Sequence, residues 1–412
     1  MPDTIATDVV DVLVVGGGPA GSAAARVLAA AGRDVLVVDK ATFPRDKCCG
    51  DGLTTLALRE LEHIGFRPEQ VPSWTVVDEA VLRSPSGREV SLPLGGPGQY
   101  AAVTPRIELD AALVDHARAA GARIAGGHGF DHLVEHDDER VAVAVDGLGV
   151  ITARYLIAAD GMWSPIRKAL HCNEPGYLGE WHGFRQYARN VTGPAAARLY
   201  VWFEPDLIPG YAWSFPLPDG RVNIGFGILR DGDRKVQDMK TMWPDILVRP
   251  HIREALGPHA EMEDRHTAWP IPARVDEAVL SSGRVLFTGD AAMATDSLTG
   301  EGIGQALLTG RLAAEAIIAA GGIDAQRTSA TYERNVQDHL FADHRMSVRL
   351  GRILAKEWGA RGAVRVVGTN DWTRRNFARW MFEDEPRAIA LTPRRWHSGL
   401  FRQPGAFADR TR

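Results

Sequence analysis

The chain has 412 residues, more than a single hydrophobic core usually holds, so we expect two or three domains. Its composition, 45% hydrophobic and 24% charged, is that of an ordinary folded protein and excludes a mostly disordered or collagen-like chain. The net charge of -5 gives no sign of the basic surface that a nucleic-acid partner requires. Three cysteines are too few for a disulfide framework, which favours a cytoplasmic location.

The sequence shows neither the pattern of a secretion signal nor that of a membrane span. Residues 1–15 carry no basic segment ahead of their apolar run, so we do not expect a signal peptide. The longest mainly apolar window, residues 307–318, is interrupted by Arg311 and Glu315. We therefore predict a chain that does not cross a membrane.

The N-terminal elements predict a βαβ unit. Residues 9–15 form an apolar, β-branched run without helical periodicity, as expected for a strand buried on both faces. An Ala-rich segment over residues 19–31, followed by Gly32, predicts a helix that stops at the glycine. A second apolar run over residues 34–38 predicts the next strand, which ends at Asp39.

The remaining segments predict a second kind of structure inserted into the first. Strand-like runs at 141–145, 155–158 and 284–287 continue the first domain, and a helix over about 302–320 follows. The turn-punctuated runs at 199–204 and 221–229 predict antiparallel strands instead. The predicted α/β fold has a discontinuous Rossmann-like domain (1–71, 106–175 and 266–330), an inserted, mostly antiparallel β domain (72–105 and 176–265) and a C-terminal helical region (331–412).

A glycine-rich turn between the first strand and the first helix predicts a dinucleotide site. Gly16, Gly18 and Gly21 form the pattern G-x-G-x-x-G. The first glycine allows the tight turn, the second lets the backbone approach a pyrophosphate, and the third permits close helix packing. Asp39 is placed to accept hydrogen bonds from ribose hydroxyls, which favours FAD or NAD over NADP.

Two later motifs resemble those of the two-domain flavoproteins, a family that includes aromatic hydroxylases, flavin-dependent halogenases and geranylgeranyl reductases. The motifs are Asp160-Gly161-x-x-Ser164-x-x-Arg167 and Gly289-Asp290 with the later turn 299–304. The resemblance implies that Asp290 contacts the ribityl oxygens of FAD and that the helix after the turn points at the isoalloxazine ring. In these flavoproteins the first motif is linked to FAD and to the nicotinamide donor, and the resemblance implies the same here. The alternative is a simple turn at Asp160-Gly161 followed by a solvated Arg167.

Arg106 opens a predicted helix, with Asp110 one turn later, and allows two interpretations. The pair can be an i,i+4 ion pair that contributes about 0.3–0.5 kcal/mol. In the resembled flavoproteins an arginine in the corresponding motif contacts the cofactor, and this implies the same role for Arg106.

Two segments narrow the resemblance to the geranylgeranyl reductase family. Residues 47–53, K-C-C-G-D-G-L, are similar to its K-x-C-G-D-G-L motif beside the flavin, and residues 211–216, Y-A-W-S-F-P, are similar to its substrate-cavity motif. With the G-E-G-I turn at 300–303, the likeness covers about residues 8–320. The chain departs from the family at residues 296–298, where members usually carry a proline.

The first of these segments also has a physical interpretation of its own. Gly50 and Gly52 flank Asp51 and give a backbone that can pass close to a flat ligand, with Cys49 facing it. We expect no metal site, because no further Cys or His cluster has ligand spacing. Cys48 is expected to be a bystander.

The second segment predicts a row of aromatic side chains. Tyr211, Trp213 and Phe215 alternate along a predicted strand and so project from one face. They either pack in the core of the sheet or, with Pro216, wall an apolar substrate cavity in front of the flavin. The candidate catalytic residues are Cys49, Tyr211 and Trp213, with Cys49 the best candidate for proton donation or positioning. The candidate FAD-binding residues are Gly16, Gly18, Pro19, Ala20, Gly21, Asp39, Lys40, Arg45, Cys49, Gly50, Asp51, Gly52, Arg106, Asp160, Gly161, Gly289, Asp290, Gly300, Gly302 and Ile303.

The predicted function is the FAD-dependent reduction of carbon-carbon double bonds in an isoprenoid or similarly apolar small substrate. The alternatives are a monooxygenase on the same scaffold and a non-catalytic flavin-binding protein. A halogenase is not expected, because no lysine lies between residues 48 and 167. The expected electron donor is NAD(P)H, although no second nucleotide-binding motif is present, and the sequence leaves the oligomeric state open.

The C-terminal residues 361–412 have a basic and aromatic character that allows two interpretations. They hold eleven arginines against five acidic residues in a chain that is acidic overall. Phe377, Trp380 and Met381 fall on one face of a predicted helix. The segment is either a helical cap with solvated arginines or a peripheral membrane contact.

Overall fold

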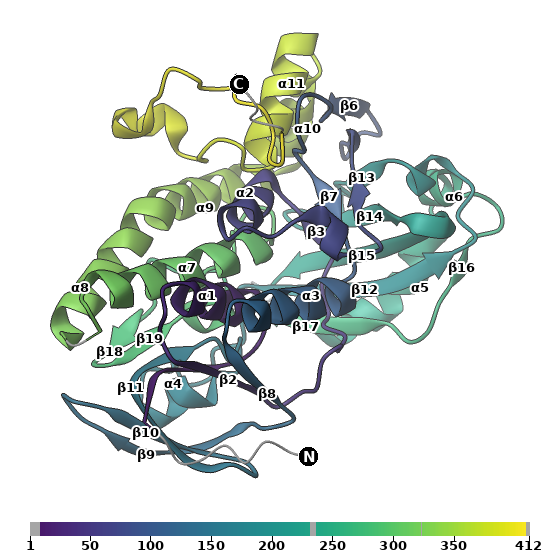
Figure 1. Ribbon diagram of the computed structural model, residues 1–412. Coiled ribbons are helices and arrows are strands. Elements are labelled where there is room, and N and C mark those ends of the chain that lie inside the picture. Colours follow the sequence, from purple (N-terminus) through teal and green to yellow (C-terminus); the bar gives the residue numbers. More distant parts are fainter. Residues whose placement is uncertain (1–8, 231–235, 323, 409–412) are drawn as a thin grey trace.

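The computed structural model describes residues 9–230, 236–322 and 324–408, and in these parts of the chain two large sheets organise the fold (Figure 1). The residues examined for a signal peptide before Val9, Lys235 among the lysines, and Asp409, Arg410 and Arg412 of the basic tail lie outside the described residues.

The first sheet has a Rossmann-like core of parallel strands. Its strands are β1 (Val10–Val15), β2 (Val35–Asp39), β8 (Arg123–Gly126), β9 (Phe130–His136), β10 (Val141–Val145), β11 (Gly149–Ala158), β18 (Ser281–Ser282) and β19 (Val285–Phe287). The parallel order is β19-β11-β1-β2-β8, while β9 and β10 form an antiparallel hairpin beside β11 and β18 pairs antiparallel with β19.

Helices cover one face of this sheet. They are α1 (Pro19–Ala30), α3 (Arg106–Ala119) and α7 (Ile303–Ala319), and the β9–β10 hairpin lies on the opposite side (Figure 1). The side chains of Val12, Leu13 and Val14 in β1 are fully buried. A strand that is covered on both faces has no polar side to maintain, which explains why its sequence is a continuous apolar run.

The second sheet is mostly antiparallel. Its strands are β5 (Glu79–Arg83), β6 (Glu89–Pro93), β12 (Trp181–Arg189), β13 (Leu199–Trp202), β14 (Ala212–Leu217), β15 (Arg221–Leu229), β16 (Glu261–Met262) and β17 (Thr267–Ile271). The order is β16-β12-β15-β14-β13-β5-β6, with β17 also beside β12 and a parallel pairing between β13 and β5. The helices α5 (Met239–Leu247) and α6 (Pro250–Leu256) pack on this sheet.

Smaller elements connect the two sheets. They are α2 (Thr55–His63), α4 (Pro165–Ala169) and a small sheet of β3 (Gly52–Leu53), β7 (Ala102–Val103) and β4 (Thr75–Val76). The C-terminal helices are α8 (Ala325–Val336), α9 (Ala342–Leu354), α10 (Glu357–Val367) and α11 (Asp371–Met381). Among the described helices, none is both long and apolar enough to cross a membrane.

The predicted α/β fold class, with its Rossmann-like part, antiparallel part and C-terminal helices, is confirmed. The domain boundaries remain a prediction, and two strand pairings cross them. Strand β17 lies in a segment predicted for the first domain but pairs with β12 in the second sheet. Strand β7 lies in a segment predicted for the inserted domain but pairs with β3. Both strands border the space between the sheets, where sequence periodicity gives no boundary.

Candidate active site

A large cavity lies between the two sheets. Its volume is about 1500 Å³, and it is lined by the turn after β1, the end of β2, strand β14 and the C-terminal helices. Single-ligand pockets usually measure about 300–1000 Å³. The cavity therefore has room for a dinucleotide together with a second molecule.

The glycine-rich turn lines one end of the cavity, and its three glycines differ in what they permit. Gly16 has φ +105, and a Cβ atom there would lie 2.2 Å from the Ala159 carbonyl oxygen. A Cβ on Gly21 would lie 1.8 Å from the Gly16 oxygen, so Gly21 serves the packing of α1 and does not line the cavity. A Cβ on Gly18 would meet Arg45 Nη2 at 3.6 Å and would otherwise project into the cavity, where Pro19 and Ala20 also lie.

The acidic residue at the end of β2 is held in place by the backbone around it. Asp39 Oδ2 accepts a hydrogen bond from Gly17 N at 2.7 Å, and Oδ1 accepts one from Ala41 N at 2.8 Å. Asp39, Lys40 and Arg45 all line the cavity. The carboxylate is therefore fixed at the position where a ribose would lie relative to the glycine turn.

Asp160 and Gly161 line the same cavity, beside Gly16 of the glycine turn. Asp160 Oδ2 accepts hydrogen bonds from Ser164 Oγ at 2.8 Å and Ile166 N at 3.2 Å. Burial raises the pKa of Asp160 to about 6. Its Oδ1 atom is buried without a hydrogen-bond partner in the described part of the chain, so it can accept a hydrogen bond from a bound ligand.

Arg167 follows neither of the interpretations that the sequence allowed. It is 5% exposed and does not line the cavity. Its guanidinium donates hydrogen bonds to the carbonyl oxygens of Val279, Ala291 and Cys172 at 2.8, 3.0 and 2.5 Å. Arg167 therefore ties α4 to the segments on either side of β19 instead of being solvated or contacting the cofactor.

The second flavoprotein motif lies beside the N-terminus of α7. Gly289, Asp290, Gly300, Gly302 and Ile303 all line the cavity. Gly300 has φ +69, a conformation that favours glycine. The loop takes its shape without the family's proline because Asp296 Oδ1 accepts hydrogen bonds from Leu298 N and Thr299 N at 3.0 and 2.8 Å.

The lining residues fit FAD. The N-terminus of α1 has no side-chain cap, so its dipole and free N–H groups are available to a pyrophosphate. An acid stands at the ribose position, an open glycine stands where the backbone must approach, and an unpartnered carboxylate oxygen of Asp160 lies beside Gly16. These groups suit a dinucleotide, and the cavity that they line extends to the turn before α7.

The segment Cys49 to Gly52 lies under the apolar part of the cavity, and Asp51 fixes it from behind. Asp51 is fully buried, does not line the cavity and has φ 65. Its carboxylate accepts hydrogen bonds from Tyr187 Oη at 2.6 Å and Asn223 Nδ2 at 2.8 Å. Burial raises its pKa to about 6. Asp51 was predicted to bind FAD, but its side chain points into this network and positions its neighbours.

The cysteines and glycines beside Asp51 do reach the cavity. Cys48, Cys49, Gly50 and Gly52 all line it. Burial raises the pKa of the Cys49 thiol to about 12, so it stays protonated at neutral pH. Cys48 lies in the same wall, so the structure does not separate the two cysteines as clearly as the sequence prediction did.

The ion pair that the sequence allowed for Arg106 is present, and its cofactor contact stays a prediction. Its Nε and Nη2 atoms donate to the two carboxylate oxygens of Asp110 at 2.7 and 2.8 Å. Arg106 also lines the cavity and lies beside the Cys49 thiol. The bidentate pair with Asp110 therefore holds the guanidinium at the cavity wall, where a cofactor contact remains a prediction.

Strand β14 carries the predicted row of aromatic side chains. The ring centroids of Tyr211 and Trp213 are 6.1 Å apart, and those of Trp213 and Phe215 are 6.2 Å apart. All three residues line the cavity, and a Cβ on Gly52 would lie 2.9 Å from the Phe215 ring. Pro216 does not line the cavity, because alternate residues of a strand point to opposite faces. The prediction for Pro216 was wrong.

Residues that the sequence did not single out complete the cavity. Lys47 Nζ lies 3.4 Å from the centroid of the Trp269 ring, and burial lowers the pKa of Lys47 to about 8. Glu301 follows Gly300, and its Oε1 atom accepts hydrogen bonds from Ile303 N and Gly304 N at 2.9 and 3.3 Å. Burial raises the pKa of Glu301 to about 7. Both residues stand inside quoted motifs, K-x-C-G-D-G-L and G-E-G-I, which was the available signal.

The C-terminal helices form a wall of the cavity. Leu350 and Leu354 from α9, Val364 from α10 and Phe377 and Trp380 from α11 line it. Arg379 and Arg387 of this region are buried, at 7% and 3% exposure. The helices therefore line the cavity, and the expectation that the arginines of a helical cap are solvated is wrong for Arg379 and Arg387. Sequence periodicity carries no signal for contacts between segments so far apart.

Known proteins are similar to this chain in sequence and in architecture. The FAD binding domain family matches residues 9–334. The chain is 34% identical over 365 residues to a menaquinone reductase of Mycolicibacterium smegmatis, an alignment that covers 84% of each chain. It is 32% identical over 361 residues to digeranylgeranylglycerophospholipid reductase 1 of Methanopyrus kandleri, which covers 84% of this chain and 90% of that one.

The crystal structure of a geranylgeranyl bacteriochlorophyll reductase-like protein from Thermoplasma acidophilum has the same fold. The TM-score is 0.78 at 21% identity, with 94% of this chain and 99% of that chain covered. The chain belongs to the geranylgeranyl reductase family of FAD-dependent oxidoreductases. This geranylgeranyl reductase family member is an enzyme whose cofactor is FAD, as the sequence motifs predicted.

Proposed function

We propose that this family member saturates a carbon-carbon double bond in the polyprenyl chain of a quinone. The apolar half of the cavity carries this proposal. Its walls are aliphatic and aromatic side chains from both the second sheet and the C-terminal helices, among them Leu82, Val201, Phe203, Leu354, Val364 and Phe377. Relatives named menaquinone reductase, 34–37% identical to the chain, support a prenylated quinone as the substrate.

The proposed roles in the reaction follow from the geometry. Bound FAD, once reduced, supplies the hydride. Tyr211, Trp213 and Phe215 hold the prenyl chain against the flavin, because their rings lie in one row opposite Gly50 and Gly52. A thiol with a pKa of about 12 is a weak acid, so we assign Cys49 to positioning the reacting carbons. Tyr211 Oη donates its hydrogen to the Thr299 carbonyl, which turns that proton away from the substrate.

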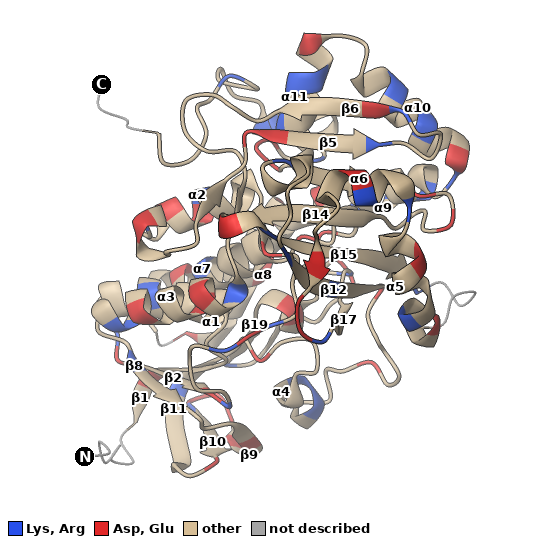
Figure 2. Cartoon of the chain, turned by 90° about the vertical axis from the view of Figure 1, so that its right-hand side faces the viewer, with Lys and Arg blue, Asp and Glu red and all other residues tan. Residues whose placement is uncertain are grey.

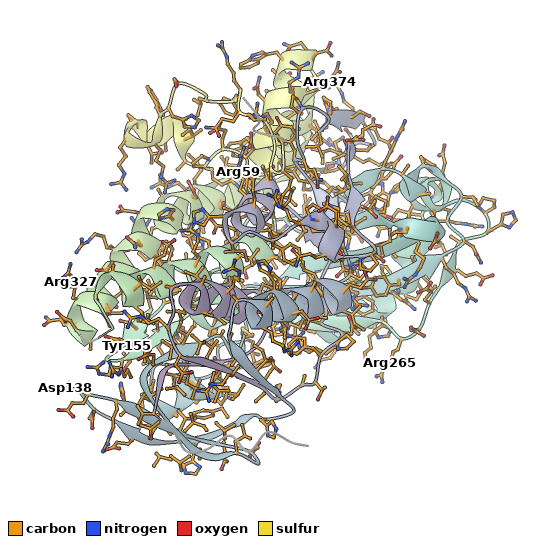
Figure 3. The ribbon with its side chains drawn as sticks, viewed as in Figure 1. Arg59, Asp138, Tyr155, Arg265, Arg327 and Arg374 are labelled. Atoms are coloured by element: carbon orange, nitrogen blue, oxygen red, sulfur yellow. The ribbon has the colours of Figure 1, made fainter. Side chains whose placement is uncertain are left out.

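We further propose NAD(P)H as the electron donor. The cavity has an opening lined by basic residues at Lys240, Arg265 and His266, next to Lys47 and Trp269. Arg265 points away from the body of the chain in Figure 3. Basic side chains beside an aromatic ring suit the phosphates and the nicotinamide of such a donor. Anaerobic bleaching of the flavin absorbance by NADH or NADPH tests this assignment, and a flavin that neither donor reduces would contradict it.

We also propose that the protein is cytoplasmic and that it draws its substrate from a membrane surface. Trp358 lines the cavity and is 71% exposed, and Ile353, also at the cavity wall, is 47% exposed. Basic residues lie along α10 and α11 nearby (Figure 2). Exposed tryptophan and arginine side chains together are typical of a helix that binds an anionic membrane surface.

An anaerobic reaction tests the proposed function. The flavin is reduced with one equivalent of dithionite, a short-chain menaquinol is added, and the flavin spectrum and product mass are recorded. The quinol is used because its ring is already reduced, so flavin reoxidation and added hydrogen report the prenyl chain alone. We expect reoxidation without oxygen and a product heavier by two hydrogen atoms. Reoxidation that requires oxygen and adds one oxygen atom would instead establish the monooxygenase. FAD that no donor reduces would indicate a non-catalytic flavoprotein.

A further inference from the structure

Saturation of a double bond needs a proton as well as a hydride, and the proposed site residues leave its source unassigned. The inference below rests on the proposed function. One largely buried carboxyl lies close to the cavity. It belongs to a part of the chain that follows residues 9–334, the region that matches the FAD binding domain family. This carboxyl belongs to Glu383, directly after α11, and its side chain is 9% exposed.

Thr54 joins Glu383 to the cavity. Thr54 lines the cavity and stands at the N-cap of α2, where a threonine hydroxyl usually caps the helix. Here the hydroxyl makes no capping bond and lies 2.8 Å from Glu383 Oε2 instead. The free N–H of Thr55 is satisfied by the Phe382 carbonyl at 2.7 Å. The Phe382 carbonyl thus satisfies the first N–H of the helix, and Glu383 takes the hydroxyl that would otherwise cap the second or third N–H.

The other carboxylate oxygen of Glu383 contacts Gln305, whose side-chain amide can hydrogen-bond to the carboxyl in both its ionised and its protonated form. Gln305 Nε2 donates to Glu383 Oε1 at 2.9 Å, while Gln305 Oε1 is buried without a partner in the described residues. A half-turn of this amide would let Oε1 accept a hydrogen bond from a protonated carboxyl. Gln305 is 3% exposed, so its amide changes orientation inside the protein, away from solvent.

Glu383 also borders a second cavity, on the other side of the loop before α7. This cavity measures about 590 Å³ and is lined by Glu383, Gln305 and Arg387 together with outer residues such as Asp338 and Arg394. The side chains of Asp338 and Arg394 are 54% and 68% exposed. Water can therefore reach Glu383 from outside without passing through the apolar part of the main cavity.

The segment that carries Glu383 is fixed to the body of the protein. Glu383 has φ 60, an uncommon conformation for a residue with a side chain. The next residue, Asp384, forms ion pairs with Arg59 of α2 and Arg379 of α11. Figure 3 shows Arg59 between α2 and the C-terminal segment. These contacts hold the carboxyl against Thr54.

We propose that Glu383 and Thr54 form the proton route to the active site, from the second cavity through the Thr54 hydroxyl to the substrate. With the carboxyl protonated, Glu383 donates across the 2.8 Å contact and the Thr54 hydrogen turns to the main cavity. The two electrons of the hydride form one new C–H bond. The two π electrons of the double bond form the second C–H bond, with the proton from Thr54. Thr54 regains a proton from Glu383, and water in the second cavity reprotonates Glu383.

The charges around Glu383 permit this role near neutral pH. Arg387 Nη2 lies 3.8 Å from Oε1, and Asp296 and Glu301 are the neighbouring carboxylates. Burial outweighs the favourable charge of Arg387 and raises the pKa of Glu383 to about 8. The proton is therefore present at neutral pH and is lost as the pH rises through about 8.

The test measures anaerobic reoxidation of the reduced flavin by a short-chain menaquinol, whose ring is already reduced, between pH 6 and pH 10, in water and in deuterium oxide. The variants are Glu383→Gln and Thr54→Val, with Thr54→Ser as the conservative rescue. Glu385→Gln is the matched control, because this buried neighbour contacts Phe401 N and His397 and not Thr54. FAD content and thermal unfolding check folding, and infrared spectra at pH 7 report the protonated carboxyl.

We expect wild type, Thr54→Ser and Glu385→Gln to lose rate above about pH 8 and to show a solvent isotope effect. Glu383→Gln and Thr54→Val should be slower by about tenfold or more at pH 7, with a flat pH profile. The infrared absorption of buried protonated carboxyls at pH 7 should lose the Glu383 component in Glu383→Gln and keep the component of Glu301, whose pKa is about 7. Wild-type profiles in both Glu383→Gln and Thr54→Val, or loss of the isotope effect in Glu301→Gln instead, would overturn the route. Reduced wild-type protein whose flavin menaquinol does not reoxidise would overturn the proposed function itself.

Discussion

The carboxylate of Asp51 accepts a hydrogen bond from the amide of Asn223 at 2.8 Å, across the boundary between the cofactor loop and the second sheet. The same Asn223 amide nitrogen donates to the Cys49 carbonyl at 2.8 Å, and its oxygen accepts from Trp213 Nε1 at 3.1 Å. One side chain on β15 therefore sets the distance between the thiol segment and the aromatic wall. Catalysis depends on that distance, because small displacements of a bound substrate cost large factors in rate.

Replacing Asn223 should disturb both stability and turnover. Asn223→Ala removes three buried hydrogen bonds, and we expect the free energy of unfolding to fall by about 3 kcal/mol. Turnover should fall further than FAD content, since the pyrophosphate site is distant from β15. Thermal unfolding and anaerobic turnover measure the two effects. Asn376→Ala, at an exposed amide of α11, is the control and should match wild type in both.

Two glycines of the same motif should respond differently to a side chain. Gly18→Val places its side chain in the open cavity, so the apoprotein should fold but bind little FAD. Gly21→Ala puts a Cβ 1.8 Å from the Gly16 carbonyl oxygen and should destabilise the fold itself. Thermal unfolding of the apoproteins and flavin absorbance after reconstitution distinguish the cases. Full flavin occupancy in Gly18→Val would show that the cofactor does not lie at this turn.

The sequence was sufficient where a local pattern determines structure. The unit β1-α1-β2, strand β10 and helix α7 lie within a residue or two of their predicted bounds, since buried runs and glycine turns are local signals. The side of β14 taken by Tyr211 followed from alternation, and the same rule shows why including Pro216 was wrong. Contacts between distant segments had no such signal. Arg167 with Ala291, and Thr54 with Glu383, depend on the tertiary fold.

The acidity of Asp160 should make the stability of the apoprotein depend on pH. Its pKa in the folded chain is about 6, above the ordinary value of 3.8. Between these values the folded state holds a proton that the unfolded state has lost, so this group's contribution to the unfolding free energy falls as the pH rises from about 4 to about 6. The substitution Asp160→Asn should remove this pH dependence, which changes the free energy of unfolding by at most about 3 kcal/mol. Denaturant unfolding at several pH values, compared with wild type, measures it, and parallel curves would contradict it.

The two adjacent cysteines should differ in their effect on turnover. Cys49→Ala should lower turnover more than FAD content, because the thiol lies beside Arg106 at the cavity wall and not at the pyrophosphate turn. Cys48→Ala is the matched control and should retain most activity. Single-turnover reoxidation and flavin absorbance are the measurements. An inactive Cys48→Ala with an active Cys49→Ala would assign the role to the other cysteine, which lines the same cavity.

Membrane contact through the cavity mouth should depend on particular tryptophans. Trp358 of α10 and Trp372 of α11 are each 71% exposed. Exposing such large apolar rings to water does not stabilise the fold. Arg361, Arg365 and Arg375 are exposed on the same two helices and add attraction to anionic lipid.

We therefore expect the protein to float with phosphatidylglycerol vesicles at low salt and less at high salt, because screening weakens the arginine contribution. The double substitution Trp358→Ala and Trp372→Ala should reduce flotation severalfold at both salt concentrations, because it removes the apolar part of the contact. Trp396→Ala is the control, since this tryptophan is 58% exposed but lies on neither α10 nor α11. A protein that remains at the bottom of the gradient under all conditions would show that α10 and α11 serve only as the cavity wall, and that the quinone arrives by another carrier.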